Sequence, residues 1–143
     1  MCIYKKEVMT VELILKFLLS FGLGGLIGLQ RERGNHPAGL KTNTLVCIGA
    51  TLITLVSIEH FTEPHILAAI ISGIGFLGAG TILNNQNKIQ GLTTAASVWI
   101  VAGIGLAVGV GYYLGAIITT ILSLLVLEYG KLLENKVKNN RHN

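Results

Sequence analysis

Between Thr42 and Leu127 the chain carries only three charged side chains, Glu59, Glu63 and Lys88. A soluble domain interrupts its apolar segments with charges far more often, because about a quarter of its residues are charged. In this chain 51% of the residues are hydrophobic and 13% are charged. Long uncharged segments suit the hydrocarbon core of a membrane, where only helices and closed barrels satisfy every backbone polar group. We therefore expect an integral membrane protein that has the lipid bilayer as a partner.

The apolar runs predict an all-α, polytopic membrane bundle with five transmembrane helices. The spans are expected at residues 11–29, 42–58, 66–83, 92–108 and 112–130. The last two come from one uncharged run that is too long for a single crossing, and Gly109 and Gly111 permit a tight reversal near its midpoint. One transmembrane domain, residues 1–130, is then followed by a short basic cytoplasmic tail at residues 131–143.

The basic residues predict the orientation, because cytoplasmic loops carry an excess of Lys and Arg. With the N-terminus outside, the loops and the tail on the inner side hold most of the basic side chains. These are Arg31, Arg33, Lys41, Lys88, Lys131, Lys136, Lys138 and Arg141. The outer side receives Lys5 and Lys6. We expect an outer N-terminus and a cytoplasmic C-terminus.

Small residues recur in the predicted helices at the spacing that lets two helix backbones approach closely. The densest segment is Ser72 to Gly80, which reads SGIGFLGAG, and Gly24 and Gly28 repeat the spacing in the first helix. We interpret these residues as helix-packing positions. The alternative is a broken third helix that exposes its carbonyl groups to a polar path. Trp99, near the middle of the fourth span, is expected to fill a gap between helices, with a pore-lining role as the alternative.

Four short motifs follow one another along the chain. They are Gly24–Glu32 (GGLIGLQRE), Ala38–Val46 (AGLKTNTLV), Ile71–Gly80 (ISGIGFLGAG) and Gly91–Ala96 (GLTTAA), the last with Trp99 downstream. With these residues the chain resembles the membrane domain of the MgtC/SapB family over about residues 11–130. The motifs supply the candidate functional residues. These are Gly24, Gly28, Gln30, Arg31, Glu32, Lys41, Thr42, Asn43, Ser72, Gly73, Gly75, Gly78, Gly80, Gly91, Thr93, Thr94 and Trp99.

This resemblance implies a bacterial inner-membrane protein linked to magnesium homeostasis. Some family members act as regulators that restrain the proton-translocating ATP synthase, which makes that enzyme a candidate partner. Two positions depart from the family pattern, since Gln30 stands where Glu is common and Lys41 stands where Arg is common. Longer members also carry a soluble C-terminal domain, and no function of that domain is carried over to this chain.

The predicted spans offer few ligands for a dehydrated Mg²⁺, which requires octahedral oxygen atoms with one or two carboxylates. Glu12 and Glu128 fall near span ends, and Glu32 falls in a loop. A hydrated ion that passes along polar side chains is the alternative. Candidates for lining such a path are Thr42, Asn43, Ser72, Thr81, Thr93 and Thr94. The same groups also suit hydrogen bonds between helices, so we expect no cofactor and consider Mg²⁺ only as a passing ion.

The loop between the first two spans brings Arg31, Arg33 and Lys41 to one rim of the bundle. Basic side chains there could bind an anionic lipid headgroup or the acidic surface of a partner. Positive-inside anchoring accounts for Arg33 and Lys41 without a ligand. Arg31 is the stronger functional candidate, because it belongs to the first motif.

Two functions are compatible with these features. No nucleophile and base are paired within the spans, so we do not expect an enzyme. The basic tail lies beside a span, which favours attraction to the inner leaflet over binding of nucleic acid. We expect a non-enzymatic membrane regulator that acts through helix–helix contacts with other membrane proteins or with another copy of the chain. The alternative is a subunit of a transporter or channel for Mg²⁺ or another cation.

Overall fold

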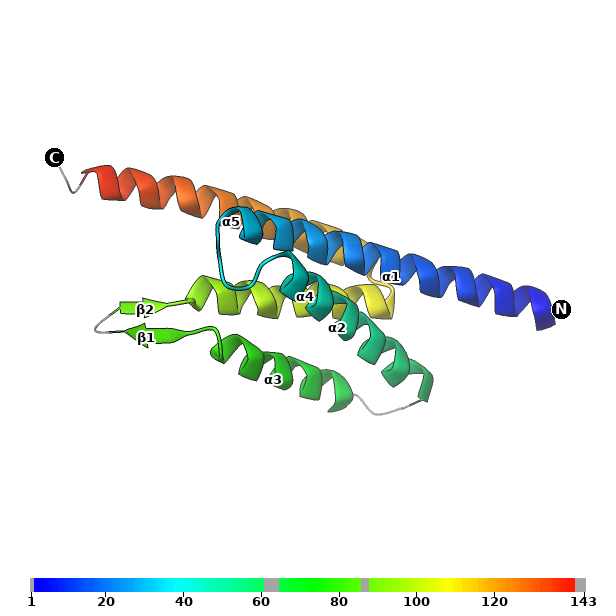
Figure 1. Cartoon of the computed structure of the whole chain (residues 1–143). Coiled ribbons are helices and arrows are strands. Elements are labelled where there is room, and N and C mark those ends of the chain that lie inside the picture. The colour runs from blue at the N-terminus through cyan, green and yellow to red at the C-terminus, as the bar shows by residue number, and fades with distance from the viewer. Residues whose placement is uncertain (1, 61–64, 86–87, 141–143) are drawn as a thin grey trace.

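The computed structural model describes the backbone of residues 2–60, 65–85 and 88–140, and the side chains of residues 9–60, 68–82 and 90–130. Five helices occupy most of this backbone. They are α1 (Cys2–Arg33), α2 (Leu40–His60), α3 (His65–Ala79), α4 (Leu92–Val110) and α5 (Tyr113–Asn140). Successive helices run in opposite directions, and the two termini lie at opposite ends of the bundle (Figure 1). The prediction of a helical bundle is confirmed.

Four of these helices are long and apolar enough to cross a membrane. The candidate spans are Met9–Arg33, Leu40–His60, Leu92–Val110 and Tyr113–Gly130. Large apolar side chains such as Leu45 and Val126 are exposed on their outer surfaces, as expected where lipid replaces water. α5 also continues as a helix to Asn140, through most of the segment expected to form the basic tail.

The third predicted span, residues 66–83, is wrong at its C-terminal end, because α3 stops at Ala79. The N–H groups of Thr81 and Ile82 each donate to the carbonyl oxygen three residues earlier, at 3.0 Å. The Thr81 hydroxyl also donates to the Gly78 carbonyl oxygen at 2.8 Å. Bonds of this kind tighten the last turn and satisfy the open carbonyl groups of a helix end. As a result, α3 is shorter than the four candidate spans.

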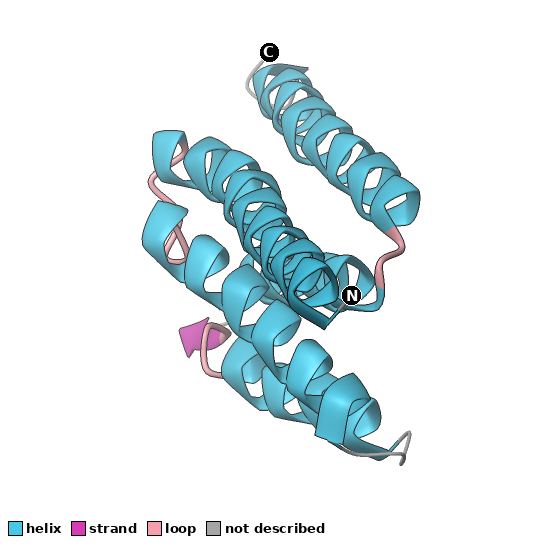
Figure 2. Ribbon diagram, turned by 90° about the vertical axis from the view of Figure 1, so that its right-hand side faces the viewer, coloured by secondary structure: helices cyan, strands magenta, loops and turns pink. Residues whose placement is uncertain are grey.

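A small antiparallel hairpin follows α3, and the all-α prediction did not include it. β1 (Leu83–Asn85) pairs with β2 (Lys88–Gln90), with Leu83 opposite Gln90. The hairpin lies at the edge of the bundle, at the end where α4 begins (Figures 1 and 2). Gly91 then joins it to α4 with a φ of 91°, and a Cβ added there would strike the Thr81 carbonyl oxygen. Glycine is required at this position, since other residues rarely adopt that φ.

α4 is the central helix, because it packs against each of the other four. The core cluster joins Ile27 of α1, Cys47 of α2 and Ile104 of α4, each at most 1% exposed. Glycines allow this close approach: a Cβ added at Gly24 would lie 2.6 Å from the Cys47 Cβ, and one added at Gly105 would strike the Cys47 carbonyl oxygen. Small residues therefore bring α1, α2 and α4 together, as membrane helices commonly require.

The chain reverses direction between α4 and α5 at Gly111, as predicted. The Gly111 N–H donates to the Val108 carbonyl oxygen at 3.1 Å, and the Tyr112 N–H donates to the Ala107 carbonyl oxygen at 2.8 Å. With a φ of 88° at Gly111, these bonds form a Schellman motif, which ends a helix and satisfies its last carbonyl groups. The prediction of two helices in this uncharged run is confirmed.

Candidate functional site

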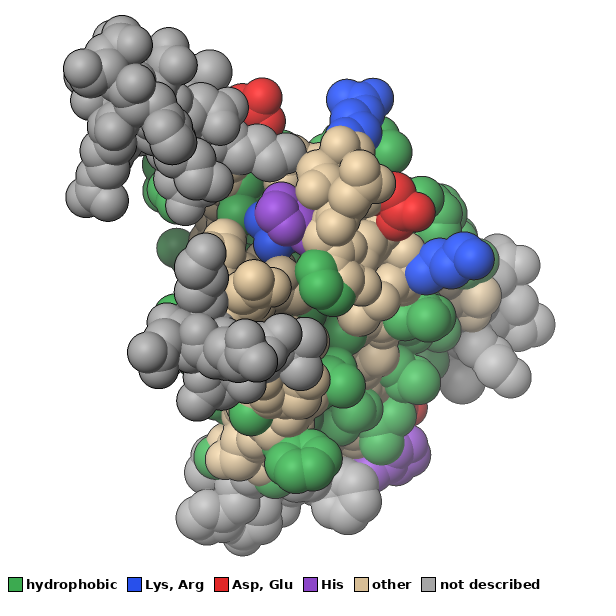
Figure 3. All heavy atoms as spheres, turned by 60° about the vertical axis from the view of Figure 1, so that its left-hand side comes forward, with side chains coloured by type: hydrophobic (Ala, Val, Ile, Leu, Met, Phe, Trp, Pro, Cys, Tyr) green, Lys and Arg blue, Asp and Glu red, His purple; other side chains and the backbone are tan. Residues whose placement is uncertain are grey.

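One end of the bundle brings three of the four motifs together. α1 ends there at Arg33, α2 begins at Leu40 and α4 begins at Leu92, at the left of Figure 1. We call it the Arg31 end. Figure 3 turns this end toward the viewer and shows basic, acidic and histidine side chains around it, with a histidine beside a basic side chain near its centre.

Arg31 is the most deeply placed charge at this end and is only 2% exposed. Its Nη2 donates a hydrogen bond to Oγ1 of Thr94 at 2.9 Å, which ties the first motif to the fourth. Its Nε is buried and has no hydrogen-bond partner among the described residues. The one ion pair among those residues joins Lys16 to Glu12. Arg31 is thus a buried cation with no described carboxylate beside it.

Glu32 contacts the N-terminal end of α2. Its Oε2 accepts a hydrogen bond from the Leu40 N–H at 2.6 Å, so the carboxylate caps the first turn of the helix. A negative charge is favourable there, because the first N–H groups of a helix have no partners within it. Gly39 leaves room for the carboxylate, since a Cβ at that position would strike Glu32 Oε2. Glu32 therefore has a structural role. Gly28 has one as well, because a Cβ added there would lie 2.7 Å from the Leu40 Cα.

Asn43 is fully buried in the first turn of α2. Its Nδ2 donates to the carbonyl oxygens of Ala38 and Gly39, both at 2.9 Å. Its Oδ1 is buried and has no hydrogen-bond partner among the described residues, and the same holds for Oγ1 of Thr44. Asn43 therefore stabilises the loop that precedes α2. Of its two neighbours in the motif, Lys41 is exposed and Thr42 is half-buried.

Gln30 connects α1 to α5 at the same end. Its Nε2 donates a hydrogen bond to Oε2 of Glu128 at 3.3 Å. A glutamate at position 30 would place two carboxylates side by side, so a glutamine at this position suits the acidic residue on α5. Sequence reasoning treated the two residues separately, because 98 positions lie between them.

A cavity of about 520 Å³ opens beside Arg31. Its polar side is formed by Arg31, His36, Gln90, Thr93 and Thr94, and its apolar side by residues of α5 that include Val126 and Leu127. Among the described lining residues none is acidic. Groups of three or more His, Cys, Asp or Glu that could hold a metal ion are absent from the described residues. The cavity is therefore suited to an anion or a neutral polar group.

The third motif runs along α3 and ends beside the fourth motif, near the Arg31 end. Of its glycines, Gly78 packs closely, with its added Cβ 3.5 Å from the Ala95 Cβ of α4. Ser72, Gly73 and Gly75 are exposed, and a Cβ at either glycine would meet nothing within 4 Å. Within the single chain the segment packs at Gly78, and close packing of Ser72, Gly73 and Gly75 against another helix stays a prediction. α3 is also unbroken from His65 to Ala79, and the chain leaves it at Gly80.

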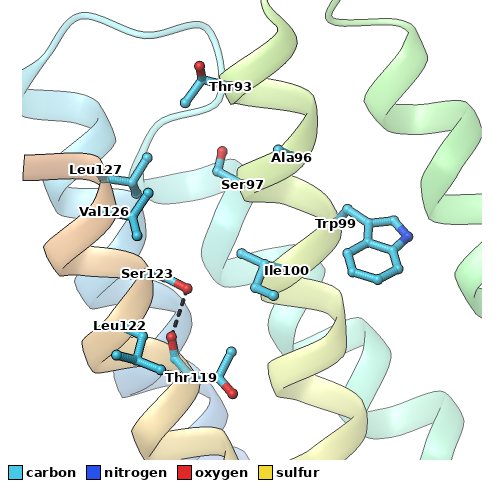
Figure 4. A pocket seen from close by; sticks show the side chains of 10 residues that line it. All are labelled: Thr93, Ala96, Ser97, Trp99, Ile100, Thr119, Leu122, Ser123, Val126 and Leu127. Carbon is cyan, nitrogen blue, oxygen red and sulfur yellow. Dashed lines mark hydrogen bonds between the residues drawn. The ribbon is translucent and has the colours of Figure 1, made fainter. Parts of the chain in front are cut away.

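Trp99 projects from α4 on the side turned away from α5 (Figure 4). The expectation that it fills a gap between helices is wrong for the single chain, because half of the residue (50%) is exposed. It also borders an apolar groove of about 630 Å³ between α4 and α5, together with Thr93, Ser97 and Ser123. This groove shares Thr93, Val126 and Leu127 with the cavity beside Arg31, so the two spaces are neighbours.

Lys16 is an important residue that the sequence reasoning missed. It lies within the first candidate span, and its Nζ donates to the Gly109 carbonyl oxygen near the end of α4 at 3.2 Å. The same Nζ is 3.1 Å from Oε1 of Glu12, one turn away. A positive charge is favoured at the C-terminal end of a helix, where carbonyl groups lack partners. The Glu–Lys spacing of four residues was a usable signal for this pair.

Residues 17–136 match the family model of the MgtC family. The chain belongs to the MgtC family. Its sequence relatives and its apolar helices identify a multi-pass membrane protein, and the resemblance drawn from the four motifs is confirmed. No solved structure matches the chain significantly.

Several curated relatives carry the names of this family. The chain is 41% identical over 122 residues to Protein MgtC of Salmonella typhimurium, covering 84% of this chain and 53% of the relative. It is 39% identical over 130 residues to Protein SapB of Bacillus subtilis, covering 82% and 56%. It is 37% identical over 131 residues to the Putative magnesium transporter YhiD of Escherichia coli, covering 84% and 61%. The chain thus spans a little over half the length of these relatives.

Proposed function

We propose that the protein is a non-enzymatic regulator of the bacterial inner membrane, linked to magnesium homeostasis, that acts by binding other membrane proteins or a second copy of itself. The ATP synthase is the candidate partner that the family suggests. In this proposal the N-terminus is outside and the C-terminus is cytoplasmic. The names of the relatives, one MgtC and one a putative magnesium transporter, support the link to magnesium.

The exposed face of α3 is the observation that carries this proposal. At 100° per residue, Ala69, Ser72, Gly73, Phe76 and Ala79 fall on one side of the helix, and all five are exposed. Gly78, on the other side, is the residue that contacts α4. Phe76 is 86% exposed. We call this face, four small residues around one aromatic side chain, the trough.

Such a face favours a protein neighbour over lipid. Glycine within a helix lowers the stability of the helix by about 1 kcal/mol relative to alanine. Contact with lipid alone does not offset this loss. A second helix gains from the trough, because small residues let two backbones approach closely and make many van der Waals contacts. The described chain leaves this gain unused at Gly73, on this face, and at Gly75, which borders it; an added Cβ at either position would meet nothing within 4 Å.

The test is to fill the trough without disturbing the fold. Gly73→Leu and Gly75→Leu should lower both co-purification with ATP synthase membrane subunits and cross-linking between Ser72→Cys copies. Gly22→Leu is the matched control, since Gly22 is exposed on α1 and has open space around its Cβ position. The proposal fails if the α3 variants keep both associations at the level of the control.

Transport of Mg²⁺ is the second candidate function, because one relative is named a putative magnesium transporter. Among the described residues, however, no group of three or more His, Cys, Asp or Glu is placed to hold a metal ion. Mg²⁺ flux into liposomes that contain the purified chain, lost on substitution of Thr93 or Ser72, would favour transport over regulation.

A further inference from the structure

Arg31 requires a negative partner that the described chain does not supply. The residue is 2% exposed, its Nε has no hydrogen-bond partner among the described residues, and its one neutral partner is Oγ1 of Thr94. A buried charge without a counter-charge is costly, because the surrounding protein replaces little of its lost hydration. The cavity beside Arg31 is large enough for a ligand, at about 520 Å³.

The start of α4 adds a second attraction for an anion in the same cavity. Gly91, Leu92, Thr93 and Thr94 all line it, and Gly91 offers no side chain to cap the helix. The first N–H groups of a helix lack partners within it, and the helix dipole is positive at that end. Helix N-termini bind phosphate groups for these reasons. Arg31 and the α4 N-terminus thus converge on one space.

An apolar groove begins beside this space and lies between residues 93–100 of α4 and residues 119–127 of α5. It has a volume of about 630 Å³, and its described lining residues are uncharged. Figure 4 shows Ile100 from α4 and Leu122, Val126 and Leu127 from α5 beside it. Thr93, Val126 and Leu127 border both the groove and the cavity. A ligand with an anionic end in the cavity and a hydrocarbon end in the groove would match both surfaces.

The geometry points to a binding site for an anionic phospholipid. The phosphate occupies the cavity, where it accepts hydrogen bonds from Arg31 and from the first N–H groups of α4. One acyl chain lies in the groove between α4 and α5. A phosphodiester carries one negative charge, which balances Arg31, and arginine binds phosphate oxygen atoms well. The site goes beyond the proposed regulatory function, since it lies on a different surface from the α3 face.

Trp99 is the single tryptophan of the chain, but it projects away from α5 (Figure 4), so the reporter protein carries Trp99→Phe together with Leu122→Trp, which places one tryptophan on a residue that lines the groove. The full chain is reconstituted in phosphatidylcholine, with a low mole fraction of either phosphatidylglycerol or phosphatidylcholine carrying brominated acyl chains. Bromine quenches tryptophan fluorescence on contact. We expect brominated phosphatidylglycerol to associate about fivefold more strongly, since a basic residue near an anionic lipid contributes roughly 1 kcal/mol.

Two variants separate the headgroup from the acyl chain. Arg31→Gln should abolish the preference for phosphatidylglycerol, whereas Arg33→Gln, which removes the same charge from an exposed residue outside the cavity, should keep it. Ser123→Phe should fill the groove and lower quenching by the bound lipid while Arg31 stays intact. If Arg31→Gln does not fold, as judged by circular dichroism, Ser123→Phe still tests the site.

Three results would overturn the inference. Equal quenching by the two brominated lipids in the reporter protein with Arg31 intact would show that no anionic lipid is selected. Equal loss of preference in Arg31→Gln and Arg33→Gln would indicate general surface charge. Displacement of brominated phosphatidylglycerol by millimolar inorganic phosphate, with no effect of Ser123→Phe, would assign the cavity to a soluble phosphate.

Discussion

Nε2 of Gln30 on α1 donates a hydrogen bond to Oε2 of Glu128 on α5, across 3.3 Å. The pair joins the first candidate span to the last at the Arg31 end of the bundle. We predict that Gln30→Glu weakens this contact, because two carboxylates would then face each other. The loss should stay below about 1 kcal/mol, since the pair is exposed to solvent. Thermal unfolding in detergent would detect it.

A double-mutant cycle tests whether the side chains at positions 30 and 128 interact directly. Glu128→Gln in the Gln30→Glu background restores one amide and one carboxylate, with their positions exchanged, and should recover the unfolding temperature. Additive losses in the double variant would show that the two side chains do not interact.

Gly105→Ala should destabilise the bundle strongly. The added Cβ would strike the Cys47 carbonyl oxygen and lie 2.8 Å from the Ala50 Cβ, so α2 and α4 would have to separate. Overpacking of this kind costs about 1–3 kcal/mol. Gly103→Ala on the same helix is the control, because its Cβ would meet nothing within 4 Å. We expect it to be neutral or to stabilise by up to about 1 kcal/mol. Equal unfolding temperatures for the two variants would contradict this packing.

Thr51→Val should weaken the contact between α2 and α4. The Thr51 hydroxyl lies 2.9 Å from the Gly105 carbonyl oxygen of α4, whereas the Thr54 hydroxyl donates to Ala50 within its own helix. A hydrogen bond between membrane helices contributes about 0.6 kcal/mol on average. Thr54→Val has the same change in shape and chemistry, so it is the matched control. Chemical unfolding in mixed micelles should separate the two; a larger loss for Thr54→Val would argue against the interhelical bond.

Glu32→Ala should loosen the first turn of α2. The substitution removes the acceptor of the Leu40 N–H, and loss of a helix cap typically costs about 1 kcal/mol. Amide hydrogen exchange should accelerate for the first residues of α2 and stay unchanged in α5. Arg33→Ala is the control, since Arg33 is an exposed residue in the same turn. Unchanged exchange at Leu40 would show that the cap is not formed.

The apolar pattern was sufficient to predict four helices and the reversal at Gly111. It failed at the end of α3, because residues 80–83 are apolar or small and only the turn around Thr81 stops the helix there. Periodicity records which residues avoid water, and it carries little information about where a tight turn replaces a helix. The hairpin of β1 and β2 was missed for the same reason, since its strands are only three residues long.

The candidate site was predicted in part. The motifs identified Arg31 and Thr94 as candidates, yet their hydrogen bond spans 63 positions and depends on how α1 packs against α4. For Gly73 and Gly75 of α3, the sequence predicted close contacts that the single chain does not make. Their spacing indicates close contact, but the sequence does not say whether the contact lies within one chain, and the structure leaves Gly73 and Gly75 open. Lys16 was overlooked because its acceptor is a backbone carbonyl oxygen on another helix.

The early end of α3 has a consequence for the surrounding lipid. Its 15 residues rise only about 22 Å, whereas the hydrocarbon core of a bilayer is about 30 Å thick. If α3 lies across the membrane, the lipid beside it must thin, at a cost of fractions of a kcal/mol per Å. Two such helices side by side would share one thinned region. Hydrophobic mismatch would then drive association at the α3 face and would favour thin membranes over thick ones.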